Sequence, residues 1–166
     1  MKSHCPLFAV LFSILFAGTA CAQIAVYAGA SGAPINGTGT SSAFGALVGV
    51  YAQKGMLLSI GGDARASFLT RNGFQYFTGA VGPRVAFRMP VLPLRPYVEG
   101  LVGVANYNNG SNSSSSTHLN YQVVGGLDAT ILPHIDWRVI EFDYSAVANS
   151  SVNAKIFTTG LVIRLW

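Results

Sequence analysis

Short segments in which apolar residues alternate with polar or small residues run through the chain from Gln23 onward. Because successive side chains of a β-strand point to opposite faces, this period predicts strands with one apolar face and one polar or glycine-lined face. Five of the six carboxylates fall on the polar side of the alternation, namely Asp63, Glu99, Asp128, Glu141 and Asp143. No segment has the spacing of an amphipathic helix over a useful length, so we expect an all-β fold.

The alternation divides into eight expected strands, at residues 24–31, 42–53, 56–69, 74–89, 95–107, 118–132, 135–146 and 154–166. Long polar connections are expected at 31–41 and 108–117, with a further loop at 149–151. Short turns are expected at 54–55, 90–93 and 132–134, and 70–73 is a short connection among the long ones. This alternation of lengths favours an up-and-down antiparallel arrangement with both chain ends on the side of the short turns.

The chain is apolar overall, with a mean hydropathy of +0.43 and 10% charged residues. After residue 22, however, no apolar stretch is long enough for a membrane-spanning helix. This combination is typical of a transmembrane β-barrel, whose apolar face meets lipid and whose polar face points inward. We therefore expect residues 23–166 to form one domain, an eight-stranded antiparallel up-and-down transmembrane β-barrel. The alternative is a secreted soluble β-sandwich or lipocalin-like carrier, in which the apolar face would be internal.

Residues 1–22 are expected to be a signal peptide and are left out of the fold. Lys2 gives a positive start, an apolar stretch runs from Leu7 to Ala17, and small residues at 20–22 precede the expected cleavage before Gln23. Both cysteines, Cys5 and Cys21, lie in this segment, so the exported chain would have neither a disulfide nor a thiolate metal site. Lipid attachment at Cys21 is an alternative to simple cleavage.

An eight-stranded barrel is just wide enough for its inward side chains to fill, so no open pore is expected. Charges buried there must be paired or hydrogen-bonded. Counting from the turn near Leu92 places Arg84 almost opposite Glu99, with Asp128 and Glu141 at comparable heights. The sequence therefore predicts an interior polar network of Asp63, Arg65, Arg84, Glu99, Asp128, Glu141, Asp143 and Arg164. In the first two strands, Tyr27 and Tyr51 are the only large side chains expected to point inward.

The outward face carries aromatic residues near the two ends of the expected strands. Near the loops these are Phe44, Phe68, Phe77, Tyr121, Tyr144 and Phe157, and near the short turns they are Phe87 and Trp166. Aromatic side chains gather at the two membrane–water interfaces of transmembrane barrels. The positions therefore predict a pair of aromatic girdles.

Four segments carry a resemblance to a known family: Pro96–Gly100, Gly125–Asp128, Arg138–Tyr144 and Gly160–Trp166. Through them, residues 23–166 resemble the small outer-membrane β-barrel proteins of Gram-negative bacteria, the OmpA-like transmembrane domain and its relatives. The resemblance implies that the last strand, with Leu161, Ile163, Leu165 and the terminal aromatic Trp166, is the signal read by the outer-membrane assembly machinery. Trp166 departs from the pattern, since it is one residue out of step with the other three.

The resemblance also implies a location in the cell outer membrane after export by the Sec pathway. The expected partners are outer-membrane lipid, lipopolysaccharide and the assembly machinery, and we expect a monomer. Lysine and arginine form no run, so no nucleic-acid partner is expected.

The main functional interpretation is a structural or surface-interaction protein that acts through the loops at 31–41 and 108–117. Paired carboxylates can perform acid–base chemistry, but a filled interior gives a substrate no access. After residue 22 the chain has two histidines, His118 and His134. A lipid-modifying barrel enzyme centred on His118, beside the serine run, is the alternative. We predict no catalytic residue, no metal site and no cofactor.

Overall fold

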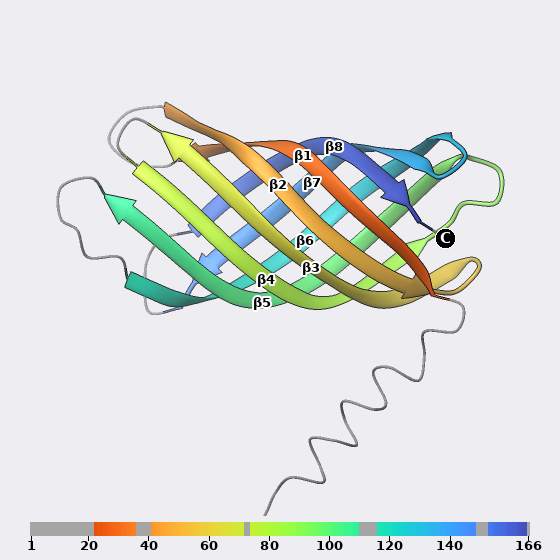
Figure 1. Ribbon diagram of the computed structural model, residues 1–166, viewed down its shortest axis with the longest axis horizontal. Helices are drawn as coiled ribbons and strands as arrows, with labels where there is room; N and C mark the ends of the chain where they lie inside the picture. The colour runs from red at the N-terminus through yellow and green to blue at the C-terminus, as the bar shows by residue number, and fades with distance from the viewer. Residues whose placement is uncertain (1–21, 36–40, 72–73, 110–115, 149–152, 166) are drawn as a thin grey trace, which may run out of the picture.

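The computed structural model describes residues 22–35, 41–71, 74–109, 116–148 and 153–165. The strands are β1 (Gln23–Ile35), β2 (Ser41–Lys54), β3 (Leu58–Arg71), β4 (Phe74–Phe87), β5 (Leu94–Asn109), β6 (Ser116–Leu132), β7 (Ile135–Val147) and β8 (Asn153–Arg164). Each pairs antiparallel with its neighbours in sequence, and β1 pairs with β8 to close the barrel (Figure 1). The predicted fold, an eight-stranded antiparallel barrel, is therefore confirmed. The described residues include no helix that is long and apolar enough to cross a membrane.

The two ends of the barrel differ. One end, on the right in Figure 1, carries the short connections β2–β3, β4–β5 and β6–β7, together with the start of β1 and the end of β8. We call it the turn end and the opposite end the loop end. The strands reach further toward the loop end than expected, since β1 continues to Ile35 and β5 to Asn109. Polar residues such as Ser31 stay in the ladder because their side chains face the interior, where the Ser31 hydroxyl lies 2.8 Å from that of Thr158.

The pairing register makes the strands tilt around the barrel axis. Successive pairs lead from Lys54 through Ile60, Val85, Val98, Gly125, Phe142, Phe157 and Gly32 back to β2 at Phe44. One circuit thus returns ten residues further along β2, from position 54 to position 44. Such a stagger requires strands tilted by roughly 35–45°. A row of paired residues therefore climbs from the turn end toward the loop end as it passes from β2 to β8.

Outside β7 the facing of the strands follows the predicted alternation, and β2 adds one large inward side chain to the expected set. Leu47 is 3% exposed and packs inside the barrel with Tyr27 and Tyr51. The expectation that the tyrosines are the only large inward side chains of β1 and β2 is therefore wrong. Leu47 and Tyr51 are four residues apart in one strand, so both point to the same face.

The alternation breaks once inside β7. Leu127 of β6 pairs with Ile140 and Asp128 pairs with Arg138, so Val139 is an extra residue in β7. The β7–β8 ladder shifts at the same place. A bulge of this kind turns the residues before it to the opposite face from the one that strict alternation gives. Arg138 therefore points into the barrel and Trp137 points outward.

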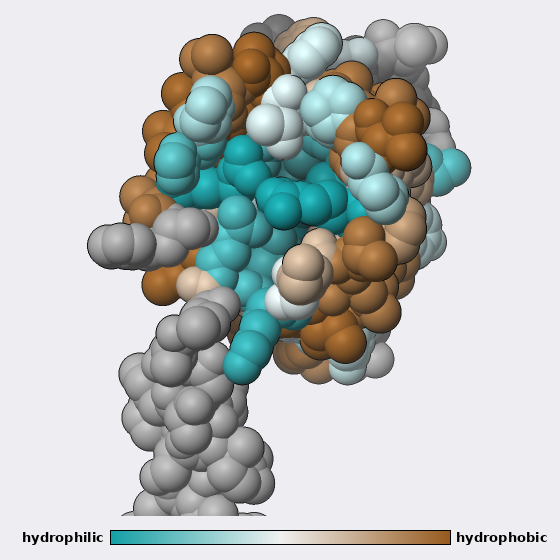
Figure 2. Space-filling view, turned by 90° about the vertical axis from the view of Figure 1, so that its right-hand side faces the viewer, coloured by the Kyte–Doolittle hydropathy of each residue, from teal (hydrophilic) through white to brown (hydrophobic). Residues whose placement is uncertain are grey.

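Polarity separates the inside of the barrel from the outside. All six carboxylates of the chain are buried, as are Arg65, Arg84, Arg95, Arg138 and Arg164. Large apolar side chains on every strand are exposed on the outer wall, from Phe142 at 37% to Phe44 at 69%. Figure 2 views the turn end and shows hydrophilic residues in the centre, surrounded by hydrophobic ones. The burial pattern is thus the reverse of that of a water-soluble protein.

The outward aromatic residues lie near the two ends of the wall. Those expected near the loop end are all exposed, namely Phe44, Phe68, Phe77, Tyr121, Tyr144 and Phe157. At the turn end, Phe87 is joined by Trp137, which the bulge turns outward and whose Nε1 donates a hydrogen bond to the Thr159 hydroxyl (3.2 Å). Trp166 lies outside the described residues.

Deleting Val139 should disrupt the barrel, because strict alternation would then send Arg138 to the apolar outer wall and Trp137 to the interior. Asp128 and Glu141 would each lose a buried partner, and removing one member of a buried ion pair costs roughly 3–5 kcal/mol. Urea unfolding in detergent micelles, followed by tryptophan fluorescence, should show a large loss of stability or no folding. The control is Val139→Ala, which keeps the residue count and should fold normally. Equal stability of the deletion and the control would contradict this role of the bulge.

Candidate functional site

Six buried charged residues form a closed ring of alternating charge in the barrel interior, here called the ionic ring. In order around the ring they are Arg65, Glu99, Arg84, Asp128, Arg138 and Glu141. Within the ring, each residue contacts two partners of opposite charge. None is more than 5% exposed. The arrangement satisfies the requirement that charges removed from water be paired.

The strand register builds one side of the ring directly. Arg84 of β4 is the register partner of Glu99 of β5, and Arg138 of β7 is the partner of Asp128 of β6. Arg84 and Glu99 form an ion pair, and the Nε atom of Arg138 lies 3.1 Å from Asp128 Oδ1. Arg84 Nη2 reaches Asp128 Oδ2 at 3.1 Å and so joins the two pairs.

The other side of the ring crosses the interior. Arg65 lies on β3, four strands from β7 in either direction around the barrel. Its Nη1 atom reaches Glu141 Oε1 on β7 at 2.9 Å, and its Nη2 atom bonds Glu99 on β5. Arg138 Nη1 completes the ring through Glu141 Oε2 at 2.8 Å. The ring thus links opposite walls of the barrel.

Three tyrosines stack against the guanidinium groups of the ring. Arg84 lies between Tyr51 and Tyr97, with its Cζ atom 4.2 and 3.7 Å from the ring centres. Arg138 lies between Tyr97 and Tyr27, at 4.9 and 4.0 Å. Stacking on an aromatic face stabilises a desolvated guanidinium.

Two glycines make room for these rings. A Cβ atom at Gly49 would lie 2.3 Å from the Tyr27 hydroxyl, and one at Gly126 would lie 2.3 Å from that of Tyr97.

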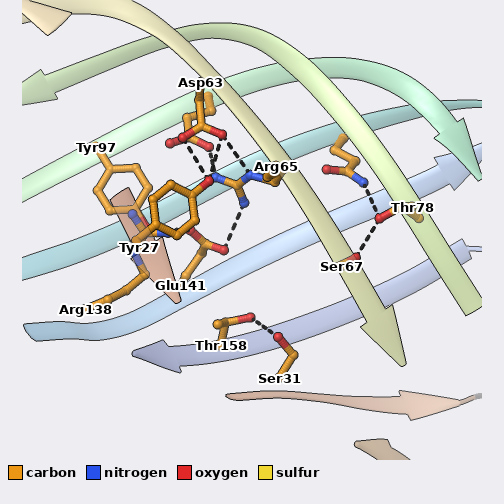
Figure 3. Close-up of polar contacts among 12 residues, drawn as sticks. Tyr27, Ser31, Asp63, Arg65, Ser67, Thr78, Tyr97, Arg138, Glu141 and Thr158 are labelled. Atoms are coloured by element: carbon orange, nitrogen blue, oxygen red, sulfur yellow. Dashed lines mark hydrogen bonds and ion pairs between the residues drawn. The ribbon is translucent and has the colours of Figure 1, made fainter. Parts of the chain in front are cut away.

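Tyrosine hydroxyls complete the hydrogen bonding of the carboxylates (Figure 3). The Tyr27 hydroxyl lies 2.8 Å from Asp63 Oδ1, which also accepts a bond from Arg65 Nε at 3.1 Å. The Tyr97 hydroxyl donates to Glu141 Oε2 at 2.6 Å. Asp63 is therefore held beside the ionic ring by both Arg65 and Tyr27.

The structure thus brings together six of the eight residues predicted for the interior network: Asp63, Arg65, Arg84, Glu99, Asp128 and Glu141. Arg164 is buried but lies apart at the turn end, where its Nη2 atom is 3.1 Å from Asp136. Asp143 is also buried, but it makes no ion pair with any described residue.

The sequence prediction missed Arg138, Arg95 and Asp136. Arg138 was not predicted to point inward, because the bulge at Val139 reverses the direction of its side chain. Arg95, which lies 3.8 Å from Asp136, could have been found, because it shares its inward parity with Tyr97 and Glu99. Asp136 is the single carboxylate that did not fit the alternation, and this misfit was itself a signal of a register change.

The interior changes character toward the loop end. Beyond the ionic ring lies a layer of hydroxyl and amide side chains. The Ser67 and Thr78 hydroxyls are 2.6 Å apart, and the Asn120 amide donates a hydrogen bond to the Ser145 hydroxyl at 2.7 Å. An apolar cluster then fills the loop end of the interior, formed by Ala33, Ala43, Leu69, Tyr76, Ala105, Val147 and Ile156. This apolar cap and the buried ring make the interior a packed core in the described part of the barrel.

His118, the centre of the enzyme hypothesis, and His134 lie at opposite ends of the molecule. His118 is inside β6, where it pairs with Ala105 of β5, and its side chain is half-buried. His134 is exposed in the β6–β7 turn and has a positive φ of 72°. Within the residues that the structure describes, no group of three or more histidine, cysteine or acidic side chains could hold a metal ion.

Comparison with known proteins identifies the architecture. No family model matches the sequence, and no curated protein is significantly similar to it. Among solved structures, the Neisserial surface protein A (NspA) has 15% identity and a TM-score of 0.61, over 87% of this chain and 96% of that one. Ail of Yersinia pestis has 16% identity and a TM-score of 0.53, over 87% and 97%.

The N-terminal β-barrel domain of Pseudomonas aeruginosa OprF has 13% identity and a TM-score of 0.55, over 87% of this chain and 100% of that domain. All three are small outer-membrane barrels of Gram-negative bacteria. At these identities, the likeness shows a common fold.

Replacing Glu99 with alanine should strongly destabilise the barrel, because Arg65 and Arg84 would each lose a buried partner. Removing one member of a buried ion pair costs roughly 3–5 kcal/mol. Urea unfolding in detergent micelles should therefore show a much lower midpoint for Glu99→Ala than for Val102→Ala. Val102 is the matched control, since it lies on the outer wall of the same strand. Small and equal effects of both substitutions would refute a structural role for the ring.

Proposed function

We propose that this protein is an integral outer-membrane β-barrel with a closed interior, and that it has a structural or surface-interaction role through the connections at its loop end. The observation that carries the proposal is the inverted polarity of the barrel, with ionic groups inside and an apolar outer wall. Hydrocarbon is the solvent in which such a wall is stable, and the closed ladder leaves no strand edge unpaired in it.

The same polarity argues against the soluble carrier. A lipocalin-like protein holds its ligand in an apolar interior and presents polar residues to water. Here the interior holds the ionic ring, and exposed apolar residues such as Val81, Val98 and Val123 are 58–66% accessible on the outer wall. A continuous apolar surface of that kind would cause a soluble protein to associate.

The aromatic residues at the two ends of the wall support a membrane position. Tyrosine, tryptophan and phenylalanine side chains are favoured where hydrocarbon meets water. Phe87 and Trp137 would mark the periplasmic surface, and Phe44 and Tyr121 the outer surface. In this orientation the turn end faces the periplasm, as short turns do in outer-membrane barrels.

The proposed partners follow from this position. Lipopolysaccharide and phospholipid would surround the wall, and the assembly machinery would read the end of the chain, where Leu161 and Ile163 of β8 and the following Leu165 are exposed. Trp166, the terminal residue of this signal, lies outside the described residues. Since the barrel closes on itself without a free strand edge, we propose that it works as a monomer.

When the full chain is expressed in a Gram-negative host, it should fractionate with the outer membrane. It should also migrate differently on gels before and after boiling, because a closed barrel resists unfolding by detergent until heated. The boiled wild-type sample marks the position of the unfolded chain on the same gel. Recovery of wild-type protein from the soluble periplasmic fraction would contradict the proposal.

The purified barrel should produce no steady ion conductance in planar lipid bilayers, because the ionic ring and the apolar cap fill its interior. Reconstitution is checked independently by protease protection of the inserted protein. Reproducible, long-lived channels from correctly inserted wild-type protein would show that the interior opens, and would end the interpretation of a closed core.

A further inference from the structure

The outer wall has a groove of about 720 Å³ across β2, β3 and β4. Ala52, Gly62 and Pro83 line its floor, and Val50 and Val81 line one side. All five residues are exposed on the lipid-facing side. The groove is therefore a feature of the outer wall.

The register explains why this part of the wall is recessed. Ala52 pairs with Gly62, and Gly62 pairs with Pro83, so the three residues form one row across the strands. The neighbouring pairs of β4 and β5 place Gly100 beside Pro83, and a Cβ atom at Gly100 would meet nothing within 4 Å. Across four strands, this row therefore carries only small side chains or none, and the wall is recessed along it.

The rows on either side of this floor carry larger side chains. One contains Ile60, Val85 and Val98, and the other contains Val81, Val102 and Tyr121. Two ridges therefore border the recessed row, and the gap between them has the linear shape of an extended hydrocarbon chain.

A lysine lies where the groove begins. Lys54 is the last residue of β2, is exposed, and contributes to the groove beside Ala52. Because the rows climb away from the turn end as they pass from β2 to β5, the groove leads from Lys54 into the depth of the apolar wall. A cation at the membrane surface thus adjoins an apolar channel that points into the hydrocarbon.

We propose that this groove is a binding site for one anionic phospholipid of the leaflet at the turn end. The ammonium group of Lys54 pairs with the lipid phosphate, and one acyl chain lies along Ala52, Gly62 and Pro83. A lysine at this depth extends its charge to the headgroup layer while its stem covers apolar surface. Charge and shape both fit a lipid better than a second barrel, whose apolar wall would leave Lys54 without a counter-charge. The inference rests on the proposed membrane position.

The test uses native mass spectrometry of the full exported chain, folded in detergent and mixed with equal amounts of dioleoyl phosphatidylglycerol and dioleoyl phosphatidylcholine. The wild-type protein should retain one phosphatidylglycerol. Lys54→Gln should weaken that adduct roughly fivefold, the effect of one basic residue beside an anionic headgroup. Gly62→Leu should abolish it, because the leucine side chain occupies the floor.

Matched controls are available on the same wall. Lys155→Gln removes the exposed lysine at the loop end, and Gly125→Leu adds the same side chain at a lipid-facing glycine of β6. Both should retain the lipid as the wild type does. A Cβ atom at Gly62 comes no closer than 3.8 Å to a neighbour and one at Gly125 meets nothing within 4 Å, so both leucine variants have room to fold.

Equal retention of the two lipids by the wild type would overturn the proposal, as would equal retention of phosphatidylglycerol by Lys54→Gln and Lys155→Gln. Protein dimers in place of lipid adducts would assign the groove to a second copy. Insertion of the wild type into phospholipid vesicles is measured in parallel. A chain that does not insert would refute the proposed function itself, whereas one that inserts without retaining the anionic lipid would refute only this site.

Discussion

The removal of charge from water inside the barrel is the constraint on which the rest of the structure depends. Each member of the ionic ring is compensated by two partners, and the ring ties β3 to β7 across the interior. Buried ion pairs contribute little net stability compared with apolar packing, but they penalise every arrangement that separates them. A shift of one residue in any of these strands would turn its charged side chain toward the apolar outer wall. The ring therefore acts mainly by specifying the register.

That specification matters for the proposed membrane position. In a soluble sheet, the apolar face is driven inward by water. In the membrane position proposed above, the outer wall meets hydrocarbon, so apolar residues gain little from packing inside. Polar contacts must then determine how the interior packs. In this barrel the stacked tyrosines add to the contacts of the ionic ring. Tyr97 contacts two arginines through its ring and Glu141 through its hydroxyl, so one side chain joins both kinds of contact.

The sequence predicted the barrel because alternation, turn spacing and charge all depend on the same two-residue period. The position of Arg84 opposite Glu99 was also predictable, because a short turn fixes the register between β4 and β5. Arg138 was not predictable in this way, because a bulge adds one residue without any change in composition. The ion pair between Arg65 and Glu141 could not be predicted from the sequence either, because it depends on the curvature that brings opposite walls of the closed barrel together.

The distribution of charge along the barrel follows from the same constraint. The ionic ring is neutral by itself, and Asp63 and Asp143 add negative charge toward the middle and the loop end. Among the described residues, the turn end has four cations and one carboxylate. The cations are Lys54, Arg88, Arg95 and Arg164, and the carboxylate is Asp136. Five of the six buried carboxylates pair with arginines, whereas Asp143 makes no ion pair with any described residue. An excess of positive charge at the turn end supports the anionic lipid proposed for the groove, because basic residues at a membrane surface attract anionic headgroups.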